Sequence, residues 1–202
     1  MYRNSGKQHD KPLLWGAPGS LRTGRTRAYF IKKGIDYQEI FPSHARFMTE
    51  IVPLVGYFAI PVTELEDGTL IQDGTDTMVH MEQRFPERPM IPSSPVQQGV
   101  AWLIEFFGCD LFFIPAMHYR WNFPEQQDFL DAEFARSISP SKDPQEQKAA
   151  VAPIREFFAG FPASMGVNEN TIPAIEASHI ECLEILNQHF LHHPYLLCGH
   201  PS

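Results

Sequence analysis

All of the strand-forming patterns in this chain lie before residue 73, and the patterns that follow are helical. The clearest is AIPVTELEDGTLIQ at residues 59–72, where two short apolar segments flank Glu66-Asp67-Gly68, a sequence typical of a tight hairpin turn. Beyond it, apolar residues recur only at the spacing of an α-helix. The sequence therefore predicts a small α/β domain followed by an all-helical one.

The segment before this hairpin predicts a strand, a helix and a second strand. Residues 13–15 form a short apolar strand that ends at a turn rich in glycine and proline. A helix is predicted to begin near Ser20 and to stop at Gly34, after two lysines that suit the negative end of its dipole. Residues 35–40 form the second strand, and so short a crossover implies a parallel pair. The apolar face of this helix is predicted to comprise Leu21, Ala28 and Ile31.

The remaining segments complete a two-domain organisation. Residues 41–58 lack a regular pattern and are predicted as a loop with one short helix, while residues 75–85 form a helix closed by Pro86. Prolines among polar residues mark an extended connector. Further helices are predicted at 96–111, 124–138, 145–158 and 175–190. The predicted organisation is a polar N-terminal extension (1–12), an α/β domain (13–86), a linker (87–95) and an incomplete helical domain (96–202).

The charge and composition argue against nucleic-acid and membrane partners. The chain of 202 residues has a formal net charge of −8 and no basic stripe, whereas nucleic-acid-binding proteins normally present a cationic surface. Its first dozen residues are polar and no run of about 18 apolar residues follows, so neither a secretory leader nor a membrane span is predicted. The cysteines, Cys109, Cys182 and Cys198, form no C-x-x-C pair and fit reduced thiols. We therefore expect a cytoplasmic protein.

Residues 19–26, GSLRTGRT, differ from a phosphate-binding loop at one position, where Arg25 replaces lysine. A P-loop domain needs several parallel strands and usually an acidic residue for its metal ion at the end of a later strand. The strand patterns here stop at Gln72 with an antiparallel hairpin. Nucleotide binding is therefore not predicted, and the same residues are interpreted as a strand, a turn and a helix N-terminus.

Three histidines near the end of the chain have a spacing compatible with zinc. His189, His192 and His193 lie at i, i+3 and i+4, but Pro194 ends the helix at this point. No cysteine or carboxylate partner lies nearby in the sequence. We therefore predict no metal site.

The order of elements and several short motifs resemble those of cytosolic glutathione transferases, over about residues 13–202. The resemblance rests on WGAPGSLRTGRTRAYFIKKGIDYQEI, on IPV, on DGTLIQDGTDTMVHMEQRFP and on the closing HPYLLCGHPS. It implies a thioredoxin-like domain followed by an all-α domain, a cis Ile60-Pro61 bond, a pocket at the carboxyl ends of the parallel strands, and a homodimer. Family members continue beyond a segment such as GHPS with an aspartate that completes a helix cap. The chain is therefore expected to be truncated at its C-terminus.

Ser20 is the predicted catalytic residue. Glutathione must become a thiolate to attack an electrophile, so its sulfur needs hydrogen-bond donors and a positive potential. Ser20 stands where the first strand passes into the helix, so its hydroxyl and the unsatisfied amides of the first turn can supply both. Serine in place of the cysteine of thiol-transfer enzymes excludes a mixed disulfide at this position. The alternative is that Ser20 only caps the helix.

Two further corners of the backbone are predicted to hold the tripeptide. A cis Pro61 exposes the backbone of Ile60 to a ligand that lies alongside as an extra strand, although a proline that begins an edge strand is the simpler reading. Asp73 precedes the third helix and is predicted to bind the substrate ammonium, with the amides of Gly74 and Thr75 on its carboxylate. The alternative is that Asp73 or Thr75 is only an N-cap.

The remaining candidates concern the glycyl carboxylate and the second substrate. His44, Arg46 and Arg22 are the cations available for the carboxylate, and the alternative is that each is a solvated surface group. At Phe58-Ala59 and at Gly74 the sequence departs from the family, which usually has a basic residue or glutamine before the strand proline and a serine at the start of the third helix. A second-substrate pocket is predicted from Met117, His118, Tyr119 and Trp121. The neighbouring Phe112 and Phe113 are interpreted as residues that fill the core.

The predicted function is that of a glutathione transferase-like protein, with glutathione as co-substrate, no metal and a small electrophile or peroxide as second substrate. The alternative is a non-catalytic binding or interaction module that keeps the fold and has lost the tripeptide site. The departures at Phe58-Ala59 and Gly74 favour this alternative. The sequence does not identify the electrophile.

Overall fold

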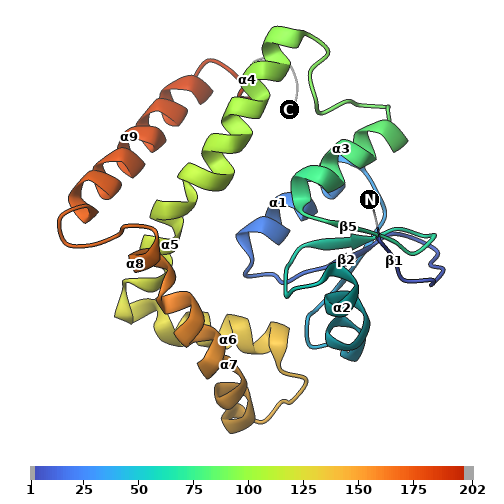
Figure 1. Cartoon of the computed structure of the whole chain (residues 1–202). Helices are drawn as coiled ribbons and strands as arrows, with labels where there is room; N and C mark the ends of the chain where they lie inside the picture. The colour runs from blue at the N-terminus through green and yellow to red at the C-terminus, as the bar shows by residue number, and fades with distance from the viewer. Residues whose placement is uncertain (1–2, 198–202) are drawn as a thin grey trace. The chain divides into compact units, whose positions relative to one another are not determined.

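The computed structural model describes residues 3–197, and Figure 1 traces the chain from blue at the N-terminus to red at the C-terminus. The described residues form two compact units, each made from two stretches of chain. The first unit comprises residues 3–88 with 130–152, and the second comprises 89–129 with 153–197. The first unit thus includes a stretch that the sequence analysis assigned to the helical domain. Cys198 and the end of the closing motif lie outside the described residues.

The first unit is built on a sheet of five short strands. They are β1 (Arg3–Asn4), β2 (Leu13–Trp15), β3 (Gln38–Ile40), β4 (Val62–Glu64) and β5 (Thr69–Gln72). Their order across the sheet is β1-β5-β4-β2-β3. β2 and β3 are parallel, whereas the other three pairs are antiparallel. This confirms the predicted parallel pair and the predicted hairpin around Gly68.

The N-terminal segment, which the sequence marks only as a polar extension, is part of this sheet. β1 pairs with the outer edge of β5, with Asn4 opposite Thr69. The backbone then follows the hairpin turn, since the amide of Ser5 donates to the carbonyl of Gly68 at 2.8 Å and that of His9 to Glu66 at 2.9 Å. The segment therefore covers an edge that would otherwise expose unpaired backbone groups.

The first helix, α1 (Leu21–Lys33), begins and ends where the sequence predicts. Ser20 is its N-cap, and Gly34 takes the left-handed conformation with φ of 74° at its C-terminus. The predicted apolar face is wrong, because Leu21 and Ile31 are 44% and 63% exposed and Ala28 is also exposed. The first turn of the helix lies so close to Gly16, after β2, that only a small side chain fits at Thr23. The buried residues of α1 are Thr23, Thr26, Tyr29, Phe30 and Lys33.

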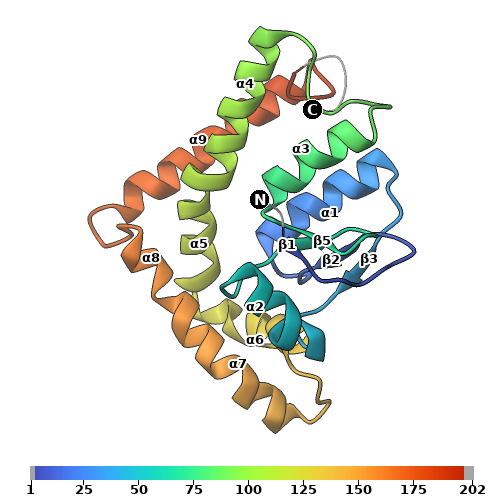
Figure 2. The same cartoon turned by 45° about the vertical axis from the view of Figure 1, so that its right-hand side comes forward.

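Helices cover both faces of the sheet in the first unit, as Figures 1 and 2 show. α1 packs beside α3 (Gly74–Arg84) on one face, and α2 (Val52–Val55) lies on the other, directly after a π-helical turn, Phe47–Ile51. Thus the segment predicted as a loop does contain a short helix. The core under α2 comprises Leu13, Trp15, Phe47, Ile51, Val55, Val62 and Leu70. Leu14 and Ile71 alternate with these residues, so they face α1 and α3.

Between residues 88 and 197, all regular structure is helical, as predicted. The division between the two units falls at Pro153, inside α7, where proline removes one backbone hydrogen bond. The helices are α4 (Pro95–Phe106), a π-helical turn (Phe107–Leu111), α5 (Phe113–Trp121), a 3-10 turn (Pro124–Gln126), α6 (Gln127–Ile138), α7 (Pro144–Ala159), α8 (Phe161–Ser164) and α9 (Ile172–Phe190).

The apolar stripe that predicts α4 is exposed rather than buried. Val96 and Leu103 are 76% and 68% exposed, and no residue of α4 is buried. The continuous helical stretch Pro95–Trp121 is also long and apolar enough to cross a membrane, which the sequence analysis did not expect. A single helix of this kind is weak support for a membrane protein, because core helices of soluble proteins have the same length and composition.

Candidate functional site

In the first unit, the predicted site residues lie close in sequence to one row of strand residues that crosses the sheet. Ile40, Trp15 and Val62 lie opposite one another across β3, β2 and β4, and Val62 lies opposite Gln72 of β5. The turn to Ser20, the Ile60-Pro61 bond, the start of α3 and the loop with His44 all leave the sheet at this row. The structure therefore brings these four segments to one edge of the sheet.

Ser20 is positioned by the turn between β2 and α1. Its amide donates to the carbonyl of Ala17 at 3.1 Å, and its hydroxyl oxygen accepts from the amide of Thr23 at 3.2 Å. The side chain therefore caps α1, as the simpler alternative holds. A hydroxyl that accepts in this way still has its own proton to donate, so capping and donation to a sulfur are compatible.

The turn itself is fixed from two sides. Arg27 of α1 donates two hydrogen bonds of 2.7 Å to Glu39 of β3 and a third, of 3.2 Å, to the carbonyl of Ala17. The hydrogen bond that Arg27 donates to Glu39 raises the pKa of Arg27 against the opposing effect of burial. On the other side, a Cβ atom at Gly16 would lie 2.2 Å from Cγ2 of Thr23, so only glycine fits there.

The Ile60-Pro61 peptide bond is cis, which confirms the prediction. Pro61 is buried and Ile60 is half-buried, and Ile60 packs against the core under α2. The carbonyl of Pro61 accepts from the amide of Asp73 at 3.4 Å, which ties this corner to the start of α3. These two predicted corners are therefore neighbours.

Asp73 has an unusual backbone, with φ of 89° in a non-glycine residue, a conformation that costs free energy and recurs at ligand sites. Its Oδ1 accepts from the amide of Thr75 at 2.7 Å, so Asp73 caps α3 and uses one of the two amides predicted to bind the substrate carboxylate. Arg25 of α1 lies 3.6 Å from the same carboxylate and donates to Oγ1 of Thr75 at 3.0 Å. No role at this corner is predicted for Arg25 from the sequence.

Contacts with Thr26 and with the same arginine explain why a serine is absent after Asp73. A Cβ atom at Gly74 would lie 2.6 Å from Oγ1 of Thr26 and 2.7 Å from Nη2 of Arg25. The contact between α1 and α3 thus leaves no room for a side chain at this position. The departure at Gly74 is therefore explained by packing.

The candidates for the glycyl carboxylate have different surroundings. Arg46 donates to Glu50 at 2.9 Å and to Glu64 at 3.0 Å, so its guanidinium is engaged within the protein. His44 is exposed; its ring lies edge-on to Trp15 with centroids 5.7 Å apart. Arg22 is half-buried in the first turn of α1. His44 is therefore the most accessible of the three.

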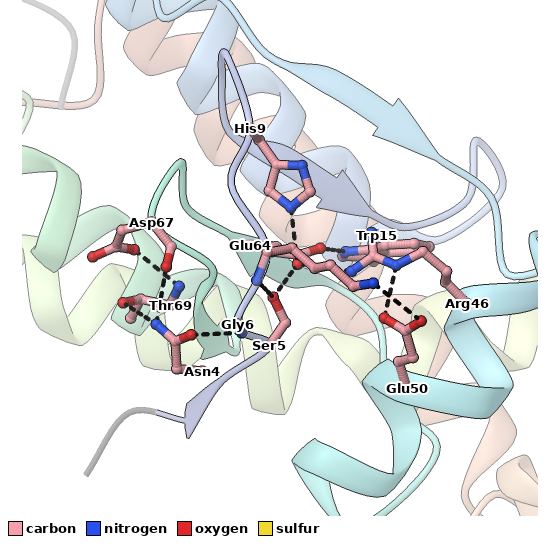
Figure 3. Close-up of polar contacts among 11 residues, drawn as sticks. Asn4, Ser5, Gly6, His9, Trp15, Arg46, Glu50, Glu64, Asp67 and Thr69 are labelled. Carbon is pink, nitrogen blue, oxygen red and sulfur yellow. Dashed lines mark hydrogen bonds and ion pairs between the residues drawn. The ribbon is translucent and has the colours of Figure 1, made fainter.

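Glu64, at the end of β4, is a buried carboxylate that the sequence analysis missed. Its oxygens accept from the Ser5 hydroxyl at 2.5 Å, Trp15 Nε1 at 2.9 Å and Arg46 Nη2 at 3.0 Å, and His9 Nε2 lies 3.0 Å away. Figure 3 shows the four side chains converging on it. Burial alone would raise the pKa of Glu64, but these hydrogen bonds outweigh it and the pKa is lowered. Glu64 is therefore an anion at neutral pH.

The predicted second-substrate residues lie in the second unit, and three of them are buried there. Met117, His118 and Trp121 are 3%, 2% and 7% exposed, whereas Tyr119 is half-buried. His118 is held by Oε1 of Glu176 at 3.0 Å from Nε2 and by Nδ2 of Asn122 at 2.9 Å from Nδ1. Within this unit, His118 ties α5 to α9.

Among residues 3–197, no group of three or more histidine, cysteine, aspartate or glutamate residues is arranged to hold a metal ion. The rings of His189 and His193 lie 4.8 Å apart, and His189 Nε2 contacts the carbonyl of Tyr195 at 2.9 Å. This contact engages one of the two nitrogens through which His189 would bind a metal.

No protein-family model matches the chain, and no curated protein is similar to it in sequence. Solved structures do match. Glutaredoxin 2 from Salmonella typhimurium, in complex with glutathione, gives a TM-score of 0.54 at 14% identity, over 96% of this chain and 79% of its own. A theta class glutathione S-transferase from Xanthomonas axonopodis pv. citri, with glutathione bound, gives 0.51 at 11% identity, over 95% of this chain and 76% of its own. These matches confirm the predicted fold class, a thioredoxin-like domain followed by a helical domain.

Other glutathione S-transferases match over less of their length. One from Rhodospirillum rubrum F11 gives a TM-score of 0.46 at 18% identity and covers 72% of this chain. The chain spans 62% of that protein and 59% of the Tau class enzyme from mango.

Proposed function

We propose that the first unit binds glutathione at the row of Trp15, Val62 and Gln72 and activates its thiol for attack on a small electrophile or a peroxide. The observation that carries this proposal is the register of β2, β4 and β5, because it gathers the Ser20 turn, Pro61 and Asp73 at one edge. Two solved proteins with this fold were crystallised with glutathione. The fold and the edge together support a tripeptide site.

The N-terminus of α1 supplies the positive potential that a thiolate needs. Its first turn contains no acidic residue, so no negative charge there weakens the positive potential of the helix dipole. The hydroxyl of Ser20 donates to the sulfur while the thiol proton leaves to solvent. The sulfur then forms a bond to the electrophilic carbon as the leaving group departs. With a peroxide, sulfur attacks one oxygen as the O–O bond breaks, and a second glutathione completes the disulfide, giving alcohol and water.

The other corners hold the rest of the tripeptide. The backbone of Ile60 pairs with the cysteinyl part, and the carboxylate of Asp73 binds the ammonium group. His44 donates to the glycyl carboxylate.

Replacing Ser20 by alanine is expected to lower kcat/KM for conjugation of glutathione to an aromatic halide by roughly tenfold or more, because the sulfur loses its donor. Ser20→Thr is the matched control, since threonine keeps both the hydroxyl and the capping oxygen. Both variants are compared with the parent protein by thermal denaturation, which registers the lost cap separately. Equal rates for Ser20→Ala and Ser20→Thr would contradict a role for the hydroxyl.

A non-catalytic binding module is the second candidate. It is favoured by the corner at Asp73, where Arg25 already accompanies the carboxylate and the amide of Thr75 is already used. Such a module would not be retained on glutathione-agarose and would release no heat with millimolar glutathione in a calorimeter. Retention, together with a rate that depends on Ser20, supports the enzyme.

We also propose that the protein is a homodimer, as the resemblance implies. The exposed stripe of α4 supports this, because apolar residues of this size gain free energy when a second copy covers them. Light scattering at micromolar concentration is expected to give twice the mass of one chain. The mass of a single chain would contradict the proposal. The stripe comprises Val96, Val100, Leu103, Phe107 and Leu111.

A further inference from the structure

The buried cluster around Glu64 connects the N-terminal segment to the residues that border the candidate site. Two of its donors, Ser5 and His9, come from this segment, while Trp15 ends β2 and Arg46 belongs to the loop after β3. Both Trp15 and the loop lie at the edge where the site residues gather. The cluster thus links two segments of the site through one carboxylate.

We propose that Glu64 is a positioning residue for glutathione binding, and that the N-terminal segment is a working part of the site because it completes the cluster around Glu64. This inference rests on the proposed function, in which His44 donates to the glycyl carboxylate. Glu64 acts on glutathione binding indirectly, by holding Trp15 and Arg46 in place.

The connection from Glu64 to His44 has two branches. Arg46 is held by Glu64 at 3.0 Å, and the amide of Arg46 donates to Nδ1 of His44 at 3.2 Å. Trp15 is held by Glu64 through its indole N–H, and its ring is the surface against which His44 lies. A neutral histidine that accepts at Nδ1 carries its proton on Nε2. The contacts therefore fix both the place of His44 and the nitrogen that donates.

The N-terminal segment fits closely against the hairpin. A Cβ atom at Gly68 would lie 2.6 Å from the carbonyl oxygen of Lys7 and 2.9 Å from Oγ of Ser5. Gly68 also has φ of 82°, which favours glycine. This close packing holds Ser5 and His9 on Glu64, where a buried anion needs its donors.

The test compares two glutamates of one hairpin. Glu64→Gln removes the charge that holds Arg46, whereas Glu66→Gln changes a side chain that pairs with Arg84 and keeps the backbone contact to His9. We expect Glu64→Gln to raise the dissociation constant for glutathione about tenfold in calorimetry, with kcat within about twofold, and Glu66→Gln to change neither. An equal effect of both substitutions would overturn the proposal.

A double-mutant cycle tests whether Glu64 acts through His44. His44→Gln alone is expected to weaken binding about as much as Glu64→Gln, and the double variant no more than either, because both remove one function. Losses that multiply would show that Glu64 acts independently of His44 and would overturn the proposal.

A readout without glutathione separates this inference from the proposed function. In the NMR spectrum, the Trp15 indole N–H is expected to exchange faster with solvent and the His44 ring signals to shift in Glu64→Gln but not in Glu66→Gln. Ser5→Ala, a milder change, is expected to give the same shifts at smaller size. Unchanged signals in Glu64→Gln would overturn the inference. If the variant shows these shifts but the parent protein binds no glutathione, only the proposed function is overturned.

Discussion

Acidification from about pH 6 to about pH 3 is expected to lower the free energy of unfolding steeply, because Glu64 takes up a proton in the unfolded chain at a higher pH than in the folded protein. Its pKa is lowered in the folded protein, so its contribution to stability is complete above the pKa of an unfolded glutamate. This contribution is lost as the pH falls through the folded pKa. Each proton taken up adds a slope of up to about 1.4 kcal/mol per pH unit. Urea unfolding followed by circular dichroism at several pH values measures this slope.

Glu64→Gln is the control for this pH dependence. Glutamine cannot ionise, so the variant is expected to be less stable at neutral pH by about 3 kcal/mol and to show a shallower fall in acid. Part of the pH dependence remains in the variant, because two other carboxylates have lowered pKa values. A hydrogen bond with Arg46 lowers the pKa of Glu50, and hydrogen bonds with Thr69 lower the pKa of Asp67. Parallel profiles for the parent and the variant would contradict the assignment of the slope to Glu64.

Replacing Gly16 by alanine is expected to lower the free energy of unfolding by about 2 to 3 kcal/mol. The new methyl group would lie 2.2 Å from Cγ2 and 2.7 Å from Oγ1 of Thr23, which is fully buried and has little room to move. Because this contact sets the distance between the β2 turn and α1, the change is also expected to displace Ser20. Urea unfolding measures the loss in stability.

Two further variants test the cause of this loss. Gly19→Ala lies in the same turn, but no atom is within 4 Å of the new methyl group, so it is expected to be nearly neutral. Thr23→Ala in the Gly16→Ala background removes the clashing atoms and is expected to recover part of the stability. If Gly16→Ala were as stable as Gly19→Ala, the close contact between the turn and α1 would be refuted.

Local signals predicted much of this fold. Asp67-Gly68 marks the hairpin, Ser20 and Gly34 mark the ends of α1, and the apolar spacing after residue 95 marks the helices. Each of these signals depends on a few residues that are adjacent in the sequence. The cis bond at Pro61 was predicted from the family resemblance and is confirmed.

Contacts between distant segments were not predictable in this way. The buried face of α1 mixes polar residues with Tyr29 and Phe30, and the close contact between Thr23 and Gly16 favours a small residue at that position. A count of apolar residues therefore identified the wrong face. The lack of space for a side chain at Gly74 comes partly from Arg25, which lies on another helix.

The cluster around Glu64 was missed for a related reason. A glutamate inside the pattern VTELE is expected on the polar face of a strand. Its carboxylate can be buried only because hydrogen-bond donors surround it. Those donors come from four places in the sequence, two of them in the N-terminal segment. The short strand β1 has two residues and so carries no periodic signal.

The pairing of β1 with β5 has a consequence for the order in which the chain folds. Asn4 and Thr69 are 65 residues apart, yet they are partners in the sheet. During synthesis the first residues leave the ribosome long before their partner strand exists. Ser5 and His9 therefore remain solvated until the hairpin emerges, because β1 can pair only once β5 has been synthesised.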